Sequence, residues 1–526
     1  MNQIQAMAPQ KYPIGIQTFS EIINEGYAYV DKTAYIPKLL DNNKYCFLSR
    51  PRRFGKSLLI STLQDYFEER RELFKGLAVE RMDKNWISSP VIRIDFNNGL
   101  YLKPDGLENR IATILSNHEK KYGLSYGSLD VANRFESLIA SVFEKTGRKV
   151  VILVDEYDKP LLNLEEDSEI YHTYQTVLKA FFGNLKTMDQ YIRFGLITGV
   201  ARFSKVSIFS DLNNLRDISM DEEFADICGW TEKELEMTFA PSIEALAKDR
   251  EESYEHTLNA IRQYYDGYLF SSRGERLYNP YSVLTAFRNR KIESYWFETG
   301  TPTLLARHVK ESGLDVGDLS ELRFKRDELL SIGQPSGNPI PLMFQTGYLT
   351  IDSYEIRRNL YSLRFPNREV EIGFSKFLLP LYAPEANRTG SKLYFQRFND
   401  DIFDGRPDAF MKRLKALFAG EAYRFHSEAE YQSLLYIIMT LAGADAEMER
   451  HTSNGRTDLE IKTDDYIYIF EIKYNKSVAE AMNQIYNRGY AERFALDPRK
   501  KFLIGINFID RESAHGIENY KIDTIN

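Results

Sequence analysis

Residues 50–57 read Arg50-Pro51-Arg52-Arg53-Phe54-Gly55-Lys56-Ser57 and decide the fold class of this chain. An apolar run at 45–48 precedes them, and residues 58–67 continue with the spacing of an amphipathic helix. A strand, a tight turn that ends in Gly-Lys-Ser and a helix together form a cradle for phosphate groups. Backbone N–H groups and the positive end of the helix dipole face the phosphates there, so the stretch predicts a nucleotide site.

Two side chains of this loop have separate roles in phosphate binding. Lys56 would reach the outer phosphates, and the Ser57 hydroxyl group would bind Mg²⁺. The general pattern G-x-x-x-x-G-K-[ST] has its first glycine where this chain has Arg50, which puts the usual β-phosphate contact in question. Either Arg52 or Arg53 could supply charge there. The expected nucleotide-binding residues of the loop are Arg52, Arg53, Phe54, Gly55, Lys56 and Ser57.

The composition is that of a globular protein with several domains. At 526 residues the chain is too long for one core, and about three domains are expected. Only two cysteines, Cys46 and Cys228, are present, which excludes a disulfide framework or zinc ribbon and favours a cytoplasmic location. No apolar span is long enough to predict a membrane helix. Because the net charge is −8, any contact with nucleic acid must come from a local basic cleft.

A second part of the nucleotide site follows the apolar run at 149–154. Such a run is typical of a strand buried on both faces of a parallel sheet, and acids at its carboxyl end lie where these sheets bind ligands. Asp155 would hold Mg²⁺, and Glu156 would polarise the water that attacks the γ-phosphate. A buried strand that merely ends in solvated acids would look the same, as the run at 91–96 does. The upstream Gly-Lys-Ser favours the catalytic interpretation.

A third strand is predicted at 194–197 and ends at Thr198. A polar residue at the tip of the strand between the phosphate loop and the acid strand can sense the γ-phosphate, and Thr198 is placed for that role. Arg202 and Asn213 are weaker candidates, because loops are rich in such residues without any function.

With these motifs the chain resembles the bacterial AAA-ATPase-like proteins that carry a C-terminal PD-(D/E)XK nuclease domain. That family writes its P-loop as Arg-Pro-Arg-Arg-Phe-Gly-Lys-Ser, so Arg50 is no departure from it. The resemblance extends through nearly the whole chain and rests on the P-loop and on the motifs Tyr27-Ala28-Tyr29-Val30-Asp31-Lys32-Thr33, Val154-Asp155-Glu156-Tyr157-Asp158-Lys159-Pro160, Tyr265-Asp266-Gly267-Tyr268, Tyr278-Asn279-Pro280-Tyr281-Ser282 and Gln345-Thr346-Gly347-Tyr348-Leu349-Thr350.

The resemblance implies an α/β protein with a P-loop NTPase parallel-sheet core, a helical or winged-helix-like lid and a C-terminal α/β restriction-endonuclease-like domain. We expect the ATPase domain at 1–218, the lid at 219–330, a connector at 331–404 and the nuclease-like domain at 405–526. The turn at 279–280 would lie against the nucleotide base. A winged helix can also bind DNA, but a lid is the simpler interpretation. The connector shows no chemistry in its sequence.

A second candidate site lies near the C-terminus. Residues 455–461 and 466–470 alternate with period two, which predicts two strands joined by a polar turn at 463–465. Glu471 and Lys473 would share one face of the second strand. Folding the hairpin would bring Asp458 opposite or diagonal to Glu471.

Two carboxylates and an ammonium group in one small volume favour a bound divalent cation, Mg²⁺ or Mn²⁺. The ion would be held by Asp458 and Glu471, and Lys473 would orient or deprotonate the attacking water. The spacing Asp-x₁₂-Glu-x-Lys matches the PD-(D/E)XK pattern, although an exposed hairpin with a Glu–Lys pair would match its short form too.

The flanking helices add further candidates. Gln484 and Arg488 are four residues apart, so both would face a backbone phosphate from one side of a helix. In the nuclease family a glutamate from the first helix and a glutamine from the second often complete the site. The resemblance therefore assigns these roles to Glu430 and Gln484, with Glu428 as a competitor for the first. Tyr486 and Tyr490 are interpreted as packing residues.

The sequence thus predicts an enzyme that binds and hydrolyses ATP and cuts phosphodiester bonds with Mg²⁺ or Mn²⁺, with cutting controlled by the nucleotide. Its partner would be nucleic acid, with DNA favoured over RNA; no membrane is expected, and a homo-oligomer is left open. One alternative is a STAND-like NTP switch whose nuclease-like domain binds nucleic acid or a protein without cutting. Another is a motor that moves DNA while the nuclease trims it.

Overall fold

The computed structural model describes residues 10–525 with gaps. The residues outside the description are 42, 85, 128, 163, 166–167, 203–208, 210–211, 213, 300–304, 306–308, 310–311, 313–321, 331–337, 383–390, 421–426, 442–444, 449–450, 453–454 and 512–513. Asn213, a weaker candidate for sensing phosphate, falls outside the described residues.

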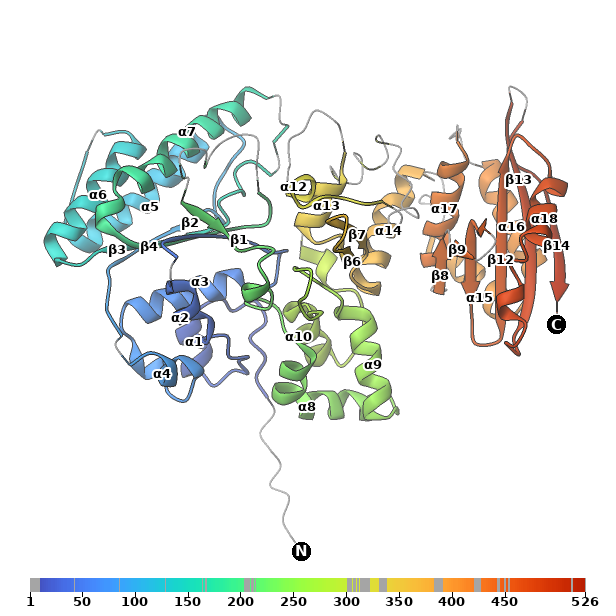
Figure 1. Cartoon of the computed structure of the whole chain (residues 1–526), viewed down its shortest axis with the longest axis horizontal. Helices are drawn as coiled ribbons and strands as arrows, with labels where there is room; N and C mark the ends of the chain where they lie inside the picture. The colour runs from blue at the N-terminus through green and yellow to red at the C-terminus, as the bar shows by residue number, and fades with distance from the viewer. Residues whose placement is uncertain are drawn as a thin grey trace, which may run out of the picture.

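A five-stranded parallel sheet forms the centre of the N-terminal domain, with the order β2-β3-β4-β1-β5 (Figure 1). Strand β4 lies between β1 and β3, as expected for the strand that ends at Thr198. Its strands are β1 (Tyr45–Ser49), β2 (Val91–Asp95), β3 (Val150–Asp155), β4 (Ile192–Gly199) and β5 (Leu215–Asp217).

Helices cover both faces of this sheet (Figure 1). Because strand side chains alternate, Cys46 and Leu48 of β1 enter one core while Tyr45 and Phe47 enter the other. One face carries α1 (Phe19–Asn24), α2 (Tyr35–Leu40), α3 (Lys56–Phe67) and α4 (Ala78–Met82). The other carries α5 (Gly106–Tyr122), α6 (Val131–Thr146) and α7 (Glu169–Thr187).

A helical lid follows and has its own small core. Its first helix begins with a capping box, in which Thr231 and Glu234 each accept a hydrogen bond from the backbone of the other. The predicted hydroxyl-before-acid start is therefore present. The lid helices are α8 (Glu232–Asp249), α9 (Tyr254–Tyr265) and α10 (Pro280–Asn289).

The segment beyond the lid contains two short helices and a hairpin. Phe324 forms a bridge with Tyr361 at the edge of the hairpin. These elements lie within the predicted end of the lid and the predicted connector. The elements are α12 (Arg326–Leu329), α13 (Ile340–Thr346), β6 (Thr350–Glu355) and β7 (Leu360–Arg364), followed by α14 (Arg368–Tyr382).

The C-terminal domain is built on a mixed sheet with the order β14-β13-β12-β11-β8 (Figure 1). Helix α18 (Val478–Asn487) packs on one face, and the helices before the sheet pack on the other. Those helices are α15 (Ser391–Phe403), α16 (Pro407–Gly420) and α17 (Glu428–Leu441). The strands are β8 (Asp445–Met448), β11 (Leu459–Lys462), β12 (Tyr466–Tyr474), β13 (Lys500–Arg511) and β14 (Ala514–Ile525), beside a small pair, β9 (His451–Thr452) and β10 (Gly455–Arg456).

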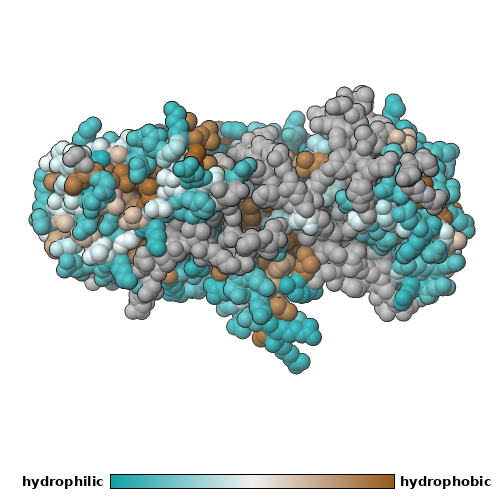
Figure 2. Space-filling view, turned by 90° about the horizontal axis from the view of Figure 1, so that it is seen from above, coloured by the Kyte–Doolittle hydropathy of each residue, from teal (hydrophilic) through white to brown (hydrophobic). Residues whose placement is uncertain are grey.

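Seen from above, the molecule is elongated, and the described part of the face in view carries hydrophilic residues interspersed with small apolar areas (Figure 2). Within the described ranges, none of the helices combines the length and the apolar character needed to cross a bilayer.

Candidate functional sites

The loop between β1 and α3 has the backbone of a phosphate cradle. Gly55 (φ +97°) and Arg53 (φ +69°) both adopt left-handed conformations, which a residue with a side chain rarely does. The ammonium group of Lys56 donates hydrogen bonds to the carbonyl oxygens of Arg50 (2.9 Å) and Pro51 (3.0 Å). Lys56 is therefore folded across its own loop, where an incoming phosphate would replace these carbonyls.

Arg50, which replaces the first glycine of the general pattern, points away from the cradle. Its guanidinium group is buried and donates to the carbonyl oxygens of Ser219 (2.7 Å), Phe224 (2.9 Å) and Ala225 (3.1 Å). It also stacks 4.1 Å from the ring centre of Phe270. Burial lowers the pKa of Arg50 to about 10. Through these hydrogen bonds the side chain connects the loop to residues 219–225, which lead into the lid.

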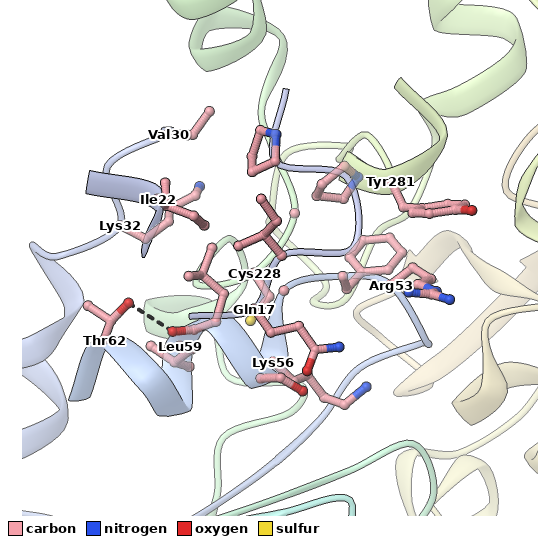
Figure 3. A pocket seen from close by; sticks show the side chains of 18 of the residues that line it. Gln17, Ile22, Val30, Lys32, Arg53, Lys56, Leu59, Thr62, Cys228 and Tyr281 are labelled. Carbon is pink, nitrogen blue, oxygen red and sulfur yellow. Dashed lines mark hydrogen bonds between the residues drawn. The ribbon is translucent and has the colours of Figure 1, made fainter. Parts of the chain in front are cut away.

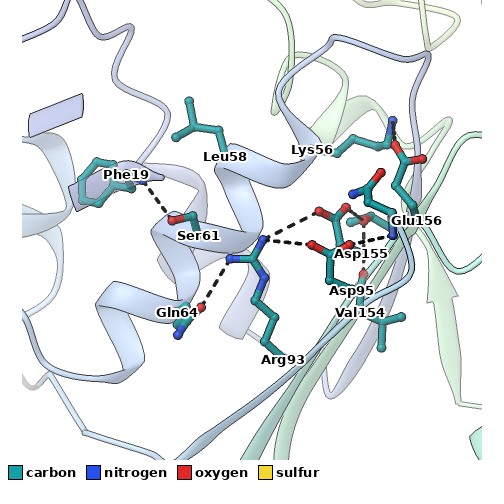
Figure 4. Close-up of polar contacts among 12 residues, drawn as sticks. Phe19, Lys56, Leu58, Ser61, Gln64, Arg93, Asp95, Val154, Asp155 and Glu156 are labelled. Atoms are coloured by element: carbon teal, nitrogen blue, oxygen red, sulfur yellow. Dashed lines mark hydrogen bonds and ion pairs between the residues drawn. The ribbon is translucent and has the colours of Figure 1, made fainter. Parts of the chain in front are cut away.

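Polar side chains meet beside Lys56 at the carboxyl ends of β3 and β4 (Figure 4). Thr198 donates its hydroxyl hydrogen to Asp155 Oδ1 at 2.9 Å. Burial raises the pKa of Asp155, and the hydrogen bonds from Ser57 and Thr198 partly oppose that rise. Ser57 and Asp155, the two predicted magnesium ligands of this site, are thus in contact.

Glu156 lies at the same edge with an unusual backbone. It has a φ of +53°, and its carboxylate lies 3.8 Å from the Lys56 ammonium group. A left-handed conformation at a residue other than glycine costs about 1–3 kcal/mol and clusters at functional sites. The turn is held in this shape by Asp158, which accepts hydrogen bonds from the N–H groups of Val200 and Ala201.

A cavity of about 320 Å³ opens over this loop (Figure 3). Lys56, Glu156 and Asn97 line it near the phosphate cradle, whereas Ile22 and Leu59 line its apolar part. The N-terminal segment 13–17 and the lid segments 227–230 and 280–281 complete the wall. Mostly apolar walls with a few polar groups are typical of pockets that bind small molecules.

Most of the other predicted loop residues also line this cavity. Arg52, Arg53, Phe54 and Gly55 all line it, and the Arg53 guanidinium group stacks 4.7 Å from the ring centre of Tyr281. Pro280, the second residue of the turn predicted to contact the base, lines the wall as well. Arg202 does not: it pairs with Asp217 at 2.6 Å.

The sequence did not identify Asn97, Lys159 or Gln17, which also line the cavity. Asn97 follows the strand at 91–95, which is adjacent to the acid strand. A polar residue just beyond a buried strand was the signal that could have found it.

In the C-terminal domain the predicted hairpin forms, with Leu459 opposite Phe470. This register places Asp458 opposite Glu471. The backbone N–H of Ile472 donates to Asp458 Oδ2 at 2.5 Å, and the Lys473 ammonium group donates to Glu471 Oε1 at 2.6 Å. All three side chains are buried.

The charges of this cluster depend strongly on one another. Burial raises the pKa of Glu471, the charge of Asp458 raises it further, and Lys473 opposes the rise. Burial works against the charge of Lys473, but the hydrogen bond and charge of Glu471, together with Asp458, raise its pKa overall. Two carboxylates held this close are stabilised by an added cation.

The residues present fit a hard divalent cation at both sites. Glu471 Oε2 and Asp155 Oδ2 are buried and accept no hydrogen bond from the residues that the structure describes. Within the same residues, no group of three or more His, Cys, Asp or Glu side chains forms a complete metal cage. Mg²⁺ is commonly held by one or two carboxylates together with water and substrate phosphates, so these carboxylates suffice only when substrate completes the shell.

Gln484 of α18 contacts Tyr490, a residue whose pKa the carboxylates of the cluster affect. The Gln484 amide donates to the Tyr490 hydroxyl group at 3.1 Å. Burial raises the pKa of Tyr490, the charges of Glu471 and Asp458 add to the rise, and Arg488 opposes it. Tyr490 is buried, in agreement with a packing role, whereas Tyr486 is half exposed and donates to Asp523.

The first helix offers two acids, and they face different neighbours. The charge of Glu428 contributes to the raised pKa values of Glu471 and Lys473. Glu430 instead contributes to those of Tyr431 and Tyr474, and its backbone N–H is capped by the Ser427 hydroxyl group. The charge of Glu428 acts on Glu471 and Lys473, which favours this residue, the competitor for the role assigned to Glu430, as the carboxylate that α17 offers to the cluster.

Comparison with known proteins identifies the families of both domains. Residues 13–209 match the family model described as "Predicted AAA-ATPase", and residues 426–517 match that of the PD-(D/E)XK nuclease superfamily. The chain is also 37% identical over 523 residues to the "Uncharacterized protein in vnfD 5'region" of Azotobacter chroococcum mcd 1. That similarity covers 95% of this chain and 97% of the relative.

Proposed function

The chain belongs to the family of AAA-ATPase-like proteins with a C-terminal PD-(D/E)XK nuclease domain, and we propose that it is an ATP-controlled, Mg²⁺-dependent nuclease. In this proposal the N-terminal domain binds and hydrolyses ATP, and the C-terminal domain cuts phosphodiester bonds. The substrate is nucleic acid, with DNA favoured over RNA.

At the nucleotide site each side chain has one task. Lys56 leaves the carbonyl groups of its loop and binds the outer phosphates. Ser57 and Asp155 would hold the metal, which would neutralise charge on the phosphates. Glu156 orients the attacking water, and Thr198 contacts the γ-phosphate from the tip of β4.

At the nuclease site Asp458 and Glu471 would hold the metal, which polarises a phosphodiester oxygen and acidifies a bound water. Lys473 orients the attacking water and offsets the negative charge that develops on the phosphate. Gln484 on α18 and Arg488 directly after this helix contact the backbone of the nucleic acid, and Glu428 adds a carboxylate from α17.

The observation that carries the proposal is the convergence of Asp458, Glu471 and Lys473 on one buried face of the hairpin. A protein that only binds nucleic acid has no need of two buried carboxylates that raise each other's energy. The cluster therefore favours cutting over the alternative of a switch that binds without cutting.

The P-loop touches the segment that leads to the nuclease domain, which supports control by nucleotide. The indole N–H of Trp296 donates to the Arg52 carbonyl oxygen at 3.1 Å. The backbone N–H groups of Tyr295 and Trp296 both donate to Glu369 on α14, at 2.5 and 2.8 Å. Movement of the P-loop would therefore displace α14.

Helix α14 in turn packs on α17 of the nuclease domain. The Tyr436 hydroxyl group of α17 is hydrogen-bonded to Glu371 of α14. Helix α17 begins at Glu428, whose charge reaches Glu471 and Lys473. A shift of α14 and α17 between two packed positions would couple the nucleotide site to the nuclease site.

Cleavage of mixed DNA and RNA substrates with Mg²⁺ or Mn²⁺ tests the proposal. Lys473→Ala is expected to lose activity by about 100-fold or more, because the ammonium group acts where charge develops. Lys521→Ala, which removes an exposed lysine of the same domain, is the control. If no substrate is cut by the unmodified protein while ATP still binds, the binding switch becomes the better account.

A further inference from the structure

Arg93 of β2 reaches across to the acids of the nucleotide site (Figure 4). Its Nη2 atom lies 3.8 Å from Asp95 Oδ2 and 4.0 Å from Asp155 Oδ2. Its Nη1 atom lies 3.5 Å from Gln64 Oε1 on α3. The side chain is 26% exposed, so water only partly screens these charges.

The strand fixes this arrangement. Ile92 and Ile94 enter the core under α5–α7, so Arg93 and Asp95 must face α3 and the P-loop. The register places Asp95 beside Asp155 at the ends of adjacent parallel strands. The carbonyl oxygen of Asp95 accepts hydrogen bonds from Arg110, which locks the end of β2.

Without nucleotide, the acids at this edge already have protein cations nearby. Arg93 lies beside Asp95 and Asp155, and Lys56 lies beside Glu156. Thr198 occupies Asp155 Oδ1, which leaves Oδ2, the oxygen facing Arg93, as the atom available to a metal ion.

We propose that Arg93 is a positioning residue that keeps free divalent metal out of the site, so that the metal enters only together with ATP. This inference rests on the proposed nucleotide site. A guanidinium group about 4 Å from Asp155 opposes a second cation at the same carboxylate. Nucleotide phosphates bring enough negative charge to overcome that repulsion. Without Arg93, the Oδ2 atoms of Asp95 and Asp155 would be left at adjacent strand ends to bind a divalent cation, while their Oδ1 atoms accept hydrogen bonds from Asn97 and Thr198.

Binding of Mn²⁺ to the full-length protein, measured by electron paramagnetic resonance without nucleotide, tests this. Arg93→Met keeps the length of the side chain and removes its charge, and it is expected to gain a site at least about tenfold tighter than in the unmodified protein. Arg93→Lys, which restores the charge, should lack the new site. The double variant Arg93→Met with Asp155→Asn should lose it, which distinguishes it from metal held by the C-terminal carboxylates.

The control is Arg70→Met. Arg70 forms an ion pair with Asp65 of α3 and lies outside the nucleotide site. Binding of Mn²⁺ with ATP confirms that the Arg93→Met, Arg93→Lys and Arg70→Met variants are folded and competent, and an unchanged circular dichroism spectrum confirms the fold of the double variant, which lacks a metal ligand. If Arg93→Met binds Mn·ATP but shows no new site for free Mn²⁺, the role of Arg93 is wrong and the proposed nucleotide site stands. If the unmodified protein fails to bind Mn·ATP, both proposals fail.

Discussion

The indole N–H of Trp296 donates a hydrogen bond to the carbonyl oxygen of Arg52, 3.1 Å away. This contact joins the phosphate loop to a residue 244 positions later in the chain. Because Trp296 is also bound through its backbone to Glu369, the nucleotide site and α14 share one rigid contact. The proposed coupling between the two sites depends on it.

Trp296→Phe removes this hydrogen bond and keeps an aromatic ring against Tyr348. One lost hydrogen bond corresponds to about 1 kcal/mol, so the effect of ATP on cleavage is expected to shrink by about fivefold. ATP binding should be retained. The ratio of cleavage rates with and without ATP is the measurement, and Trp86→Phe, in the core beneath α3, is the control. An unchanged ratio would exclude this route.

Arg50→Met is expected to destabilise the N-terminal domain by about 3 kcal/mol or more, because the buried carbonyl groups of Ser219, Phe224 and Ala225 lose a charged donor. Calorimetry should show a lower transition temperature for this domain. Arg71→Met, at an exposed arginine, should change it little. Equal transition temperatures for Arg50→Met and the unmodified protein would mean that the hydrogen bonds of Arg50 do not stabilise this domain.

Asp158 makes the stability of this domain depend on pH. Burial raises its pKa to about 7, and the charge of Glu156 adds to the rise. Because the folded pKa lies above the unfolded value of about 3.9, the contribution is complete below pH 4 and is lost as pH rises through 7. Asp158→Asn, which imitates the protonated acid, should therefore gain stability relative to the unmodified protein from pH 5 to 8. If the difference in melting temperature between Asp158→Asn and the unmodified protein stayed the same from pH 5 to 8, the raised pKa of Asp158 would be wrong.

Glu428→Gln and Glu430→Gln form a matched pair on α17. Of these two acids, Glu428 is the one whose charge helps to raise the pKa values of Glu471 and Lys473, so its loss is expected to reduce metal-dependent cleavage by about tenfold. Glu430→Gln should have a much smaller effect. Cleavage rates titrated against Mn²⁺ would separate weaker metal binding from slower chemistry. If Glu430→Gln reduced cleavage more than Glu428→Gln, Glu430 would have the role that the sequence predicted for it.

Local patterns explain why much of this arrangement could be predicted from the sequence. Gly-Lys-Ser after a strand, a buried run before Asp155 and period-two alternation around Glu471 each depend on neighbouring residues only. The hairpin turn then fixed the register that places Asp458 opposite Glu471.

Other features depend on residues that are distant in the sequence. The partners of Arg50 lie about 170 positions away, and nothing near Arg50 indicates that it turns into the protein. The choice between Glu428 and Glu430 depends on how α17 is rotated against the sheet. Arg93 looked like part of an ordinary buried strand until the register placed it beside Asp155.

The most direct test of the central claim compares cleavage with and without ATP in the unmodified protein and in Lys56→Ala. Lys145→Ala, at an exposed lysine of α6, controls for the loss of a charge. The account predicts metal-dependent cleavage whose rate changes with ATP in the unmodified protein and in the control, but not in Lys56→Ala. Cleavage that responds equally to ATP in all three proteins, or in none of them, would contradict control of the nuclease by the nucleotide site.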